Sequence, residues 1–216
     1  MSRDAVLDRI RAARHAFAQG HASHGAVPDL PTLPAPQIMA DPAGFFIERA
    51  RQVGIGIDTV ASIQAAAESA AVWCRARRAT RALVWDTPDL RPVLDRLHAE
   101  GVEMLPPDSP PDLLAQADIG ITGAEWGIAE TATLALGAGP NQPRLASLLP
   151  PVHLVILHAD RIVSDLHAFF ARVAVLPSAL TLITGPSRSA DIGSVLVLGA
   201  HGPTEVTVLL IDPSRR

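Results

Sequence analysis

The residues best suited to chemistry in this sequence are two acids that follow a short apolar segment. Residues 119–121 predict a strand, which breaks at a Thr-Gly pair before the first acid. In α/β proteins, a strand that runs into glycine and then into carboxylates places reactive groups at the carboxyl edge of a sheet. The alternative is a tight turn and a hairpin whose acids are solvated. The candidate substrate-binding residues here are Thr122, Gly123, Glu125 and Thr131.

One of the two acids, Glu130, is the better candidate for catalysis. Glu125 and Glu130 are five residues apart, so on a strand their side chains would face opposite sides. A paired-carboxylate mechanism is therefore not expected, and no pair of the candidate residues has metal-ligand spacing. Arg144 stands alone in an apolar stretch. It could clamp a carboxylate or phosphate, or it could pair with Glu130 and so satisfy a buried acid.

A second loop, residues 184–191, has the composition of an anion site. Gly185 frees the backbone, and the serines and a helix start would offer N–H and O–H donors. The alternative is a capping turn, in which Ser187 or Ser189 caps a short helix that contains Asp191. The candidate substrate-binding residues of this loop are Gly185, Pro186, Ser187, Ser189 and Asp191.

A third loop, residues 198–203, presents His201 between small residues and before Gly202. His201 is a candidate catalytic residue and Gly202 a candidate substrate-binding residue; a turn-stabilising role for the histidine is the alternative. His153 begins a predicted strand and is expected to be a core histidine. Each of the three loops follows a predicted strand, so they are expected to converge at one edge of the sheet.

The composition removes several classes of chemistry. The single cysteine, Cys74, excludes a disulfide framework and an iron–sulfur cluster held by this chain alone. It lies in a predicted helix and is expected to be a packed core residue. The chain has no lysine, which excludes Schiff-base chemistry and a Walker-type phosphate loop. A net charge of -4 gives no electrostatic case for nucleic acid.

The elements that position these loops alternate between strand and helix. This pattern predicts an α/β fold with a mostly parallel sheet and helices on both faces. A higher density of strands in the last third predicts an antiparallel edge or a small subsheet. Helices are predicted at 43–52, 62–78, 88–100, 112–117, 144–149 and 164–174, and strands at 53–60, 81–85, 102–105, 118–122, 131–136, 153–158, 180–184, 194–198 and 206–211.

The amino-terminal region differs from the rest. Residues 2–19 carry apolar positions at helical spacing and predict an amphipathic helix capped by Ser2. The proline-rich residues 28–42 predict an extended linker. The expected domains are therefore 1–42, a helical arm and linker, and 43–216, one α/β domain. The absence of a long apolar run or an apolar signal core predicts a cytoplasmic protein.

Three segments together resemble a known family. ADIGITGAEWGIAETATLAL, PRLASLLPPVHLVIL and LITGPSRSADIGSVLVLGAHGP resemble the LUD domain family of bacterial lactate utilization proteins over about residues 118–212. Ala132 departs from the family, which usually has glycine there, and its methyl group narrows backbone approach. The resemblance implies a fold similar to the NagB/RpiA/CoA-transferase group. It places the family's signature positions at Glu130, Thr131, Thr133, Arg144, Ser147, His153, Gly185, Pro186, Ser187, Asp191, His201 and Gly202.

The resemblance leads to one functional hypothesis with two rivals. It implies a non-redox subunit of a complex that oxidises L-lactate to pyruvate, with the iron–sulfur clusters on partner subunits and no cofactor on this chain alone. One rival is a stand-alone enzyme for a small carboxylate, CoA ester or folate-like substrate. In that enzyme Glu130 would be nucleophile or general base, Arg144 the carboxylate clamp, and residues 185–189 the anion cradle. The other rival is a ligand-sensing or scaffolding protein.

Overall fold

Six apolar segments of the chain form one parallel sheet. The computed structural model describes residues 5–9, 11, 39–189 and 197–214. In it the six strands pair in the order β1-β12-β7-β4-β2-β3, and each pairing between them is parallel. The largely buried, aliphatic side chains of the four inner strands suit a sheet that is covered on both faces. The strands are β1 (Gly56–Val60), β2 (Arg81–Val84), β3 (Glu103–Leu105), β4 (Ile119–Gly123), β7 (Val152–His158) and β12 (Glu205–Ile211).

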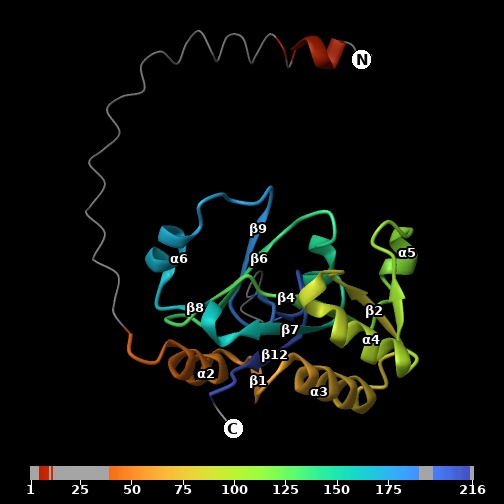
Figure 1. Ribbon diagram of the computed structural model, residues 1–216. Coiled ribbons are helices and arrows are strands. Elements are labelled where there is room, and N and C mark those ends of the chain that lie inside the picture. Colours follow the sequence, from red (N-terminus) through yellow and green to blue (C-terminus); the bar gives the residue numbers. More distant parts are fainter. Residues whose placement is uncertain (1–4, 10, 12–38, 190–196, 215–216) are drawn as a thin grey trace, which may run out of the picture. The chain divides into compact units, whose positions relative to one another are not determined.

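Helices connect these strands and cover the sheet. α3 begins after Ser62, whose hydroxyl accepts a hydrogen bond from the backbone N–H of Ala65. It packs along α4, which joins β2 to β3. From β2 to β3 the chain moves outward across the sheet, and from β3 to β4 it moves back past β2. A right-handed connection therefore puts α5 on the opposite face. Figure 1 shows α3 below the sheet and α5 above it. The helices are α2 (Pro42–Val53), α3 (Ile63–Ala76), η1 (Pro88–Leu90), α4 (Arg91–Ala99) and α5 (Pro111–Leu114).

A second sheet of four strands packs beside the first. Its order is β8-β5-β6-β9, with β6 antiparallel to both β5 and β9. Gly127 of β5 allows close packing on the main sheet, because a Cβ atom there would lie 2.9 Å from Cδ2 of Leu157. The remaining elements are β5 (Trp126–Ile128), β6 (Thr133–Gly137), η2 (Arg144–Ser147), η3 (Ala159–Arg161), β8 (Ile162–Val163), α6 (Leu166–Arg172), β9 (Leu180–Ile183), β10 (Arg188–Ser189) and β11 (Val197–Leu198).

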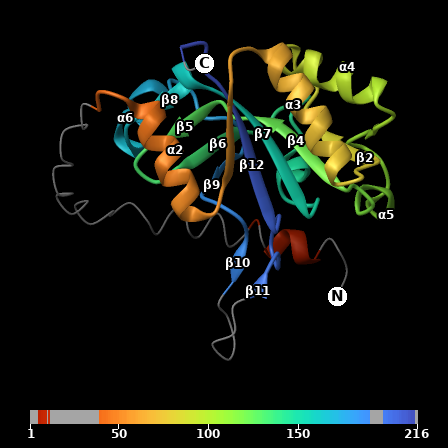
Figure 2. The same cartoon turned by 90° about the horizontal axis from the view of Figure 1, so that it is seen from below.

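The α/β class and the mostly parallel sheet predicted from the sequence are confirmed. The glycine-bearing segment 53–60 supplies edge strand β1. Of the strands predicted in the last third, residues 180–184 join the second sheet as β9, which pairs antiparallel with β6. β5 and β8 were not predicted. A helix capped by Ser187 is not observed, because residues 188 and 189 form β10 and pair with β11. A helix capped by Ser189 that contains Asp191 would fall outside the described residues. Figure 2 shows β10 and β11 extending from the end of the sheet at which β12 begins.

The chain divides into two units, Met1–Ala35 and Pro36–Arg216. In the first unit, residues 5–9 and 11 are helical, within the helix predicted over 2–19. Ser2, its predicted cap, lies outside the described residues, and the predicted domain boundary at residue 42 stays a prediction. Within the described parts of the chain, no helix is both long and apolar enough to cross a membrane.

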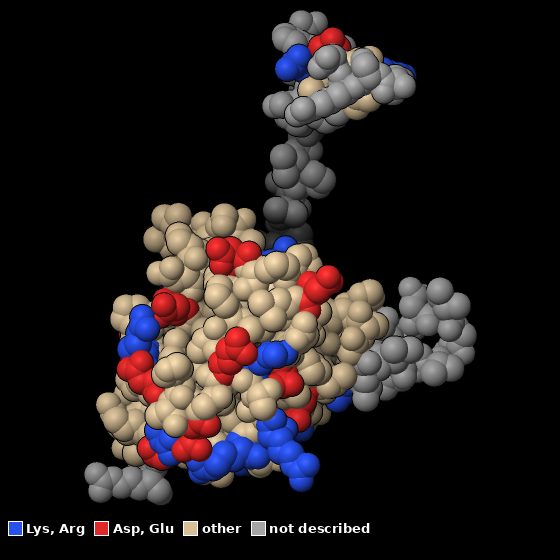
Figure 3. All heavy atoms as spheres, turned by 90° about the vertical axis from the view of Figure 1, so that its right-hand side faces the viewer, with Lys and Arg blue, Asp and Glu red and all other residues tan. Residues whose placement is uncertain are grey.

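Charged side chains of both signs are interspersed on the surface that carries α4 and α5 (Figure 3). Several of them form ion pairs between neighbouring elements. Arg75 of α3 pairs with Glu100 at 2.7 Å, and Arg96 of α4 pairs with Glu68 at 2.9 Å. Such exposed pairs each contribute about 0–1 kcal/mol to stability. On this face the surface therefore carries mixed charge in place of a field of one sign.

Cys74 is expected to be chemically inert in the folded protein. It is 1% exposed on the buried face of α3, and this burial raises the pKa of its thiol to about 11. Because only the thiolate is nucleophilic, labelling with a disulfide reagent at pH 8 should be roughly a hundredfold slower in the folded than in the urea-unfolded protein. Equal labelling rates in the two states would contradict this burial.

Candidate functional site

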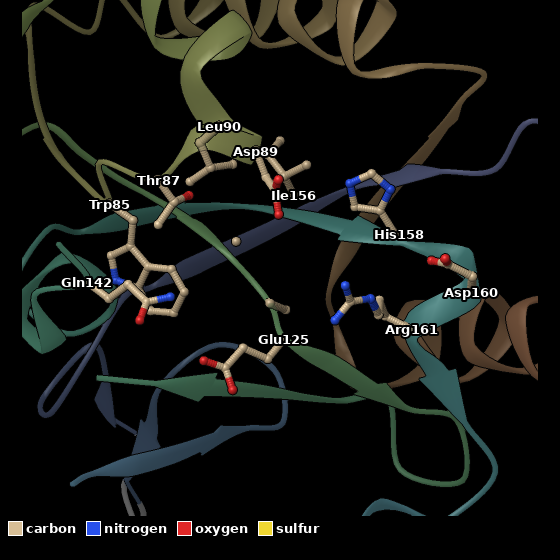
Figure 4. Close-up of a pocket in the computed structure, with 12 residues that line it drawn as sticks. Trp85, Thr87, Asp89, Leu90, Glu125, Gln142, Ile156, His158, Asp160 and Arg161 are labelled. Atoms are coloured by element: carbon tan, nitrogen blue, oxygen red, sulfur yellow. The ribbon is translucent and has the colours of Figure 1, made fainter. Parts of the chain in front are cut away.

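A cleft lies at the carboxyl edge of the main sheet, where β2, β4 and β7 end. Its volume is about 370 Å³, within the range of small-molecule sites. Trp85, Gly123 and Ile156 form part of its wall, as expected for a ligand site of an open α/β sheet. Figure 4 shows the charged and polar residues that point into it from several loops. The charged or titratable residues among them are Asp89, Glu125, His158, Asp160 and Arg161.

Glu125 reaches the cleft from the link between β4 and β5. Its backbone N–H donates to the carbonyl oxygen of Ala135 in β6 at 3.0 Å, which fixes the start of the side chain. The carboxylate lies against Gly137 of the same strand. A Cβ atom at Gly137 would come within 2.5 Å of its Oε1 atom. Glycine at this position therefore leaves room for a half-buried carboxylate in the cleft.

Two basic groups line the cleft on the side opposite Glu125. His158 ends β7, and Arg161 closes the short helix η3 that follows. The Arg161 guanidinium also lies over the ring of Trp126, 5.9 Å from its centroid, which favours its position through a cation–π contact. Figure 4 shows this guanidinium pointing into the cleft between His158 and Glu125. Arginine with histidine can bind a carboxylate, and Glu125 can accept a proton or a hydrogen bond from a neighbouring hydroxyl.

The sequence located part of this site. Gly123 and Glu125, both predicted to bind substrate, line the cleft. Thr122 does not, because it is fully buried within β4. Its Oγ1 atom lies 2.8 Å from Nε2 of His153. Burial lowers the pKa of His153 to about 3, so this histidine is neutral and belongs to the core, as the sequence predicted.

The turn between β5 and β6 carries Glu130 and Thr131 away from the cleft. The backbone N–H of Glu130 donates to the carbonyl oxygen of Ser164, and its side chain is exposed. Thr131 Oγ1 lies 2.6 Å from Oγ1 of Thr133, which in turn lies 2.6 Å from Oγ1 of Thr184. Ala132, between them, has φ +54°, a conformation that favours glycine and so gives a physical reason for the family's preference there.

The second and third loops meet each other at the opposite, amino edge of the sheet. The Ser187 N–H donates to the carbonyl oxygen of Pro203, and the His201 N–H donates to Ser187 Oγ at 3.4 Å. The Gly202 backbone packs on Ser187, while a Cβ atom at Gly185 would lie 2.8 Å from the carbonyl oxygen of Val53. Ser187 and the His201 backbone thus form these hydrogen bonds within the protein.

The expectation that all three loops converge at one edge is therefore wrong. The third loop precedes β12, whose first residue, Glu205, is in register with Val152 at the start of β7. A loop that precedes a parallel strand lies at the amino edge, whatever strand it follows. Pro186 is half-buried beside Ser187, Ser189 contributes its backbone to β10, and Asp191 lies outside the described residues.

Arg144 begins η2, and its guanidinium is exposed. Among the described residues it forms no ion pair with Glu130, so the predicted pairing is not observed. Its backbone helps to hold η2 together, because the carbonyl oxygen of Arg144 accepts a hydrogen bond from Ser147 Oγ at 3.0 Å. Of the two arginines considered, Arg161 lines the cleft and Arg144 does not.

Sequence reasoning missed the residues that follow β2 and β7. Thr87 and Asp89 come after the first of these strands, His158 ends the second, and Asp160 and Arg161 follow it. The signal was present, because the segment HLVILH is predicted to be a strand, and Asp160 and Arg161 follow its last residue after one alanine. The described residues contain no cluster of three or more His, Cys, Asp or Glu that could hold a metal ion.

Comparison with known proteins places the chain in a family. Lactate utilization protein C of Halalkalibacterium halodurans is 34% identical over 122 residues, which cover 53% of this chain and 50% of that protein. The protein of the same name from Bacillus velezensis is 40% identical over 104 residues, 45% of this chain and 43% of that one. The chain thus spans about half the length of these relatives.

A solved structure and a family model agree with these matches. The crystal structure of a DUF162 family protein from Deinococcus radiodurans aligns with a TM-score of 0.60 over 82% of this chain and 100% of that one, at 24% identity. It therefore supports the fold alone. The model of the LUD domain matches residues 46–211. The chain belongs to the LUD domain family.

Proposed function

We propose that this protein acts in lactate utilization as a non-redox subunit whose cleft binds a small hydroxy or keto carboxylate, such as lactate or pyruvate. The names of the relatives support the role. The observation that carries the ligand class is the arrangement in the cleft: Arg161 and His158 on one side and Glu125 on the other. Arg161 and His158 suit the carboxylate through direct pairing, and Glu125 suits the 2-hydroxyl. Asp89 and Asp160 also line the cleft, so the direct contact with Arg161 must offset their repulsion of an anion.

The proposed division of labour follows from the residues that the chain lacks. Oxidation of lactate to pyruvate removes two electrons and two protons, and no standard side chain accepts electrons in that way. The chain has one buried cysteine and no lysine. We therefore assign electron transfer to iron–sulfur partner subunits. This chain would bind and orient the carboxylate, with Glu125 holding the hydroxyl proton.

Replacing Arg161 by glutamine should weaken binding of pyruvate by about tenfold or more, because a charge-assisted hydrogen bond contributes about 1.5–3 kcal/mol. Isothermal titration calorimetry of the purified chain measures this directly. Arg144→Gln is the matched control, since Arg144 is exposed outside the cleft. A larger loss in Arg144→Gln than in Arg161→Gln would move the site away from the carboxyl-edge cleft.

The subunit role has its own test. The tagged chain, expressed in its native host and purified gently, should retain iron-containing partner proteins, identified by mass spectrometry and iron analysis. The purified chain alone should not reduce a dye with lactate. Dye reduction by the chain alone would overturn the proposed division of labour, whatever the outcome of the binding measurement.

A second candidate is a stand-alone enzyme for a small carboxylate, and the half-buried Glu125 favours it. In that enzyme Glu125, rather than the exposed Glu130, would be the general base or nucleophile. Glu125→Gln would then abolish an identified turnover, while Glu130→Gln would leave it near wild type. The reverse result would restore Glu130 as the catalytic acid.

A further inference from the structure

Two segments of the chain form a wall behind the carboxyl-edge cleft. One follows β2 and the other is residues 140–143, before η2. They are joined by hydrogen bonds from the Asp86 N–H to the Asn141 carbonyl oxygen, 2.9 Å, and from Trp85 Nε1 to the Pro143 carbonyl oxygen, 3.3 Å. Successive side chains of extended segments point to opposite sides. Trp85, Thr87 and Gln142 accordingly line the cleft, whereas Asp86, Asn141 and Pro143 line a second cavity behind it.

The second cavity has the size and lining of a small-molecule site. Its volume is about 430 Å³, again within the range of ligand pockets. Val84, Leu94 and Leu105 are at least nine-tenths buried and form an apolar floor. Met104 and prolines such as Pro106 extend this floor. Stiff, apolar surfaces of this kind suit a flat ring.

The polar rim of the cavity carries an excess of negative charge. Arg91 Nη2 pairs with Asp86 Oδ1 at 2.6 Å, so these two charges offset each other. Asp95 lies one turn further along α4, on the same side of the helix. Asp95 is exposed, and with the described residues its carboxylate makes neither a hydrogen bond nor an ion pair, so it is available as an acceptor. His98, also on α4, lines the same rim. Asn141 adds an amide that can donate and accept.

We propose that the second cavity binds a neutral, flat heterocycle with an amino group, of the adenosine type, and that its occupancy changes ligand affinity in the cleft across the wall. The amino group donates to Asp95, and the ring lies on the apolar floor. The unpaired carboxylate disfavours a phosphate group through like-charge repulsion. The coupling rests on the proposed carboxylate site; binding of the heterocycle does not.

Calorimetry with the whole 216-residue chain tests the ligand class. Adenosine should bind at least about tenfold more tightly than purine riboside, which lacks the amino group, and than AMP, which adds a phosphate. Asp95→Asn should remove most of the preference for adenosine over purine riboside. Asp108→Asn is the matched control, because Asp108 is exposed and lies outside the cavity. No heat or chemical-shift change with millimolar adenosine, or tighter binding of AMP, would overturn the proposal.

Filling the floor gives an independent test of location. Met104→Trp should abolish adenosine binding while pyruvate binding in the cleft persists, and adenosine binding that survives this change would overturn the assignment.

For the coupling, saturating adenosine should change the dissociation constant of pyruvate by about fivefold or more, the lower range of measured site-to-site coupling. An unchanged constant would overturn the coupling. If pyruvate fails to bind but adenosine binds, the fault lies with the proposed carboxylate site.

Discussion

Gly120→Ala is expected to lower the free energy of unfolding by about 3 kcal/mol or more. Gly120 is the second residue of β4, and a Cβ atom there would be 1.8 Å from the carbonyl oxygen of Ala146. This oxygen belongs to the backbone of η2, which is fixed in turn because the Ala146 N–H donates to the Pro143 carbonyl oxygen at 3.1 Å. Overpacking against movable side chains costs about 1–3 kcal/mol. A clash with fixed backbone should cost more, about 3 kcal/mol or more. The free energy of unfolding of a typical protein is only about 5–15 kcal/mol, so this is a large part of it.

Gly123→Ala is the matched control for this prediction. It makes the same change in the same strand, yet the nearest atom to its Cβ would be the carbonyl oxygen of Ile156, at 3.9 Å. Urea unfolding followed by circular dichroism should therefore give Gly123→Ala nearly wild-type stability. Equal losses in the two variants would mean that η2 moves away easily, and that the contact between Gly120 and Ala146 does not hold it in place.

The sequence predicted the main sheet because each of its strands carries its own signal. Segments such as residues 153–158 and 206–211 are apolar runs of strand length, and local pattern is enough to identify them. β5 has no such signal. It is three residues long, contains Gly127, and exists because β6 and β8 pair with it. Elements of this kind depend on distant partners and are not visible in local sequence.

The site was only half predictable for a related reason. Gly123 and Glu125 follow a strand whose apolar run is clear, and they were found. The loop with His201 also follows a strand, β11, but that strand belongs to a small hairpin outside the main sheet. Deciding which edge a loop occupies requires the strand that it enters, here β12. His158 and Arg161 lie at and just after the end of β7, a main-sheet strand with a clear apolar run, so the strand that this loop follows would have indicated them.

Acidification is expected to destabilise the protein through His153. Its side chain is fully buried, and burial lowers its pKa from 6.5 to about 3. Between these pH values the unfolded chain binds a proton that the folded protein does not, so stability rises with pH in this window. The contribution is complete above pH 6.5 and is lost as the pH falls toward 3. From pH 8 to pH 5, this one residue should lower the free energy of unfolding by about 2 kcal/mol.

Replacing the histidine separates this contribution from those of the other titratable groups. His153→Leu should be less stable at pH 8 by about 1–3 kcal/mol, because it leaves the buried Thr122 hydroxyl without its partner. Its loss of stability from pH 8 to pH 5 should nevertheless be smaller than that of the wild type by about 2 kcal/mol. His167→Gln, at an exposed position, controls for the removal of any histidine. Urea titrations at both pH values measure each quantity.

If His153→Leu keeps the full pH dependence of the wild type, then His153 is protonated within the fold. In that case its Nδ1 atom, which has no hydrogen-bond partner among the described residues, must have one in solution.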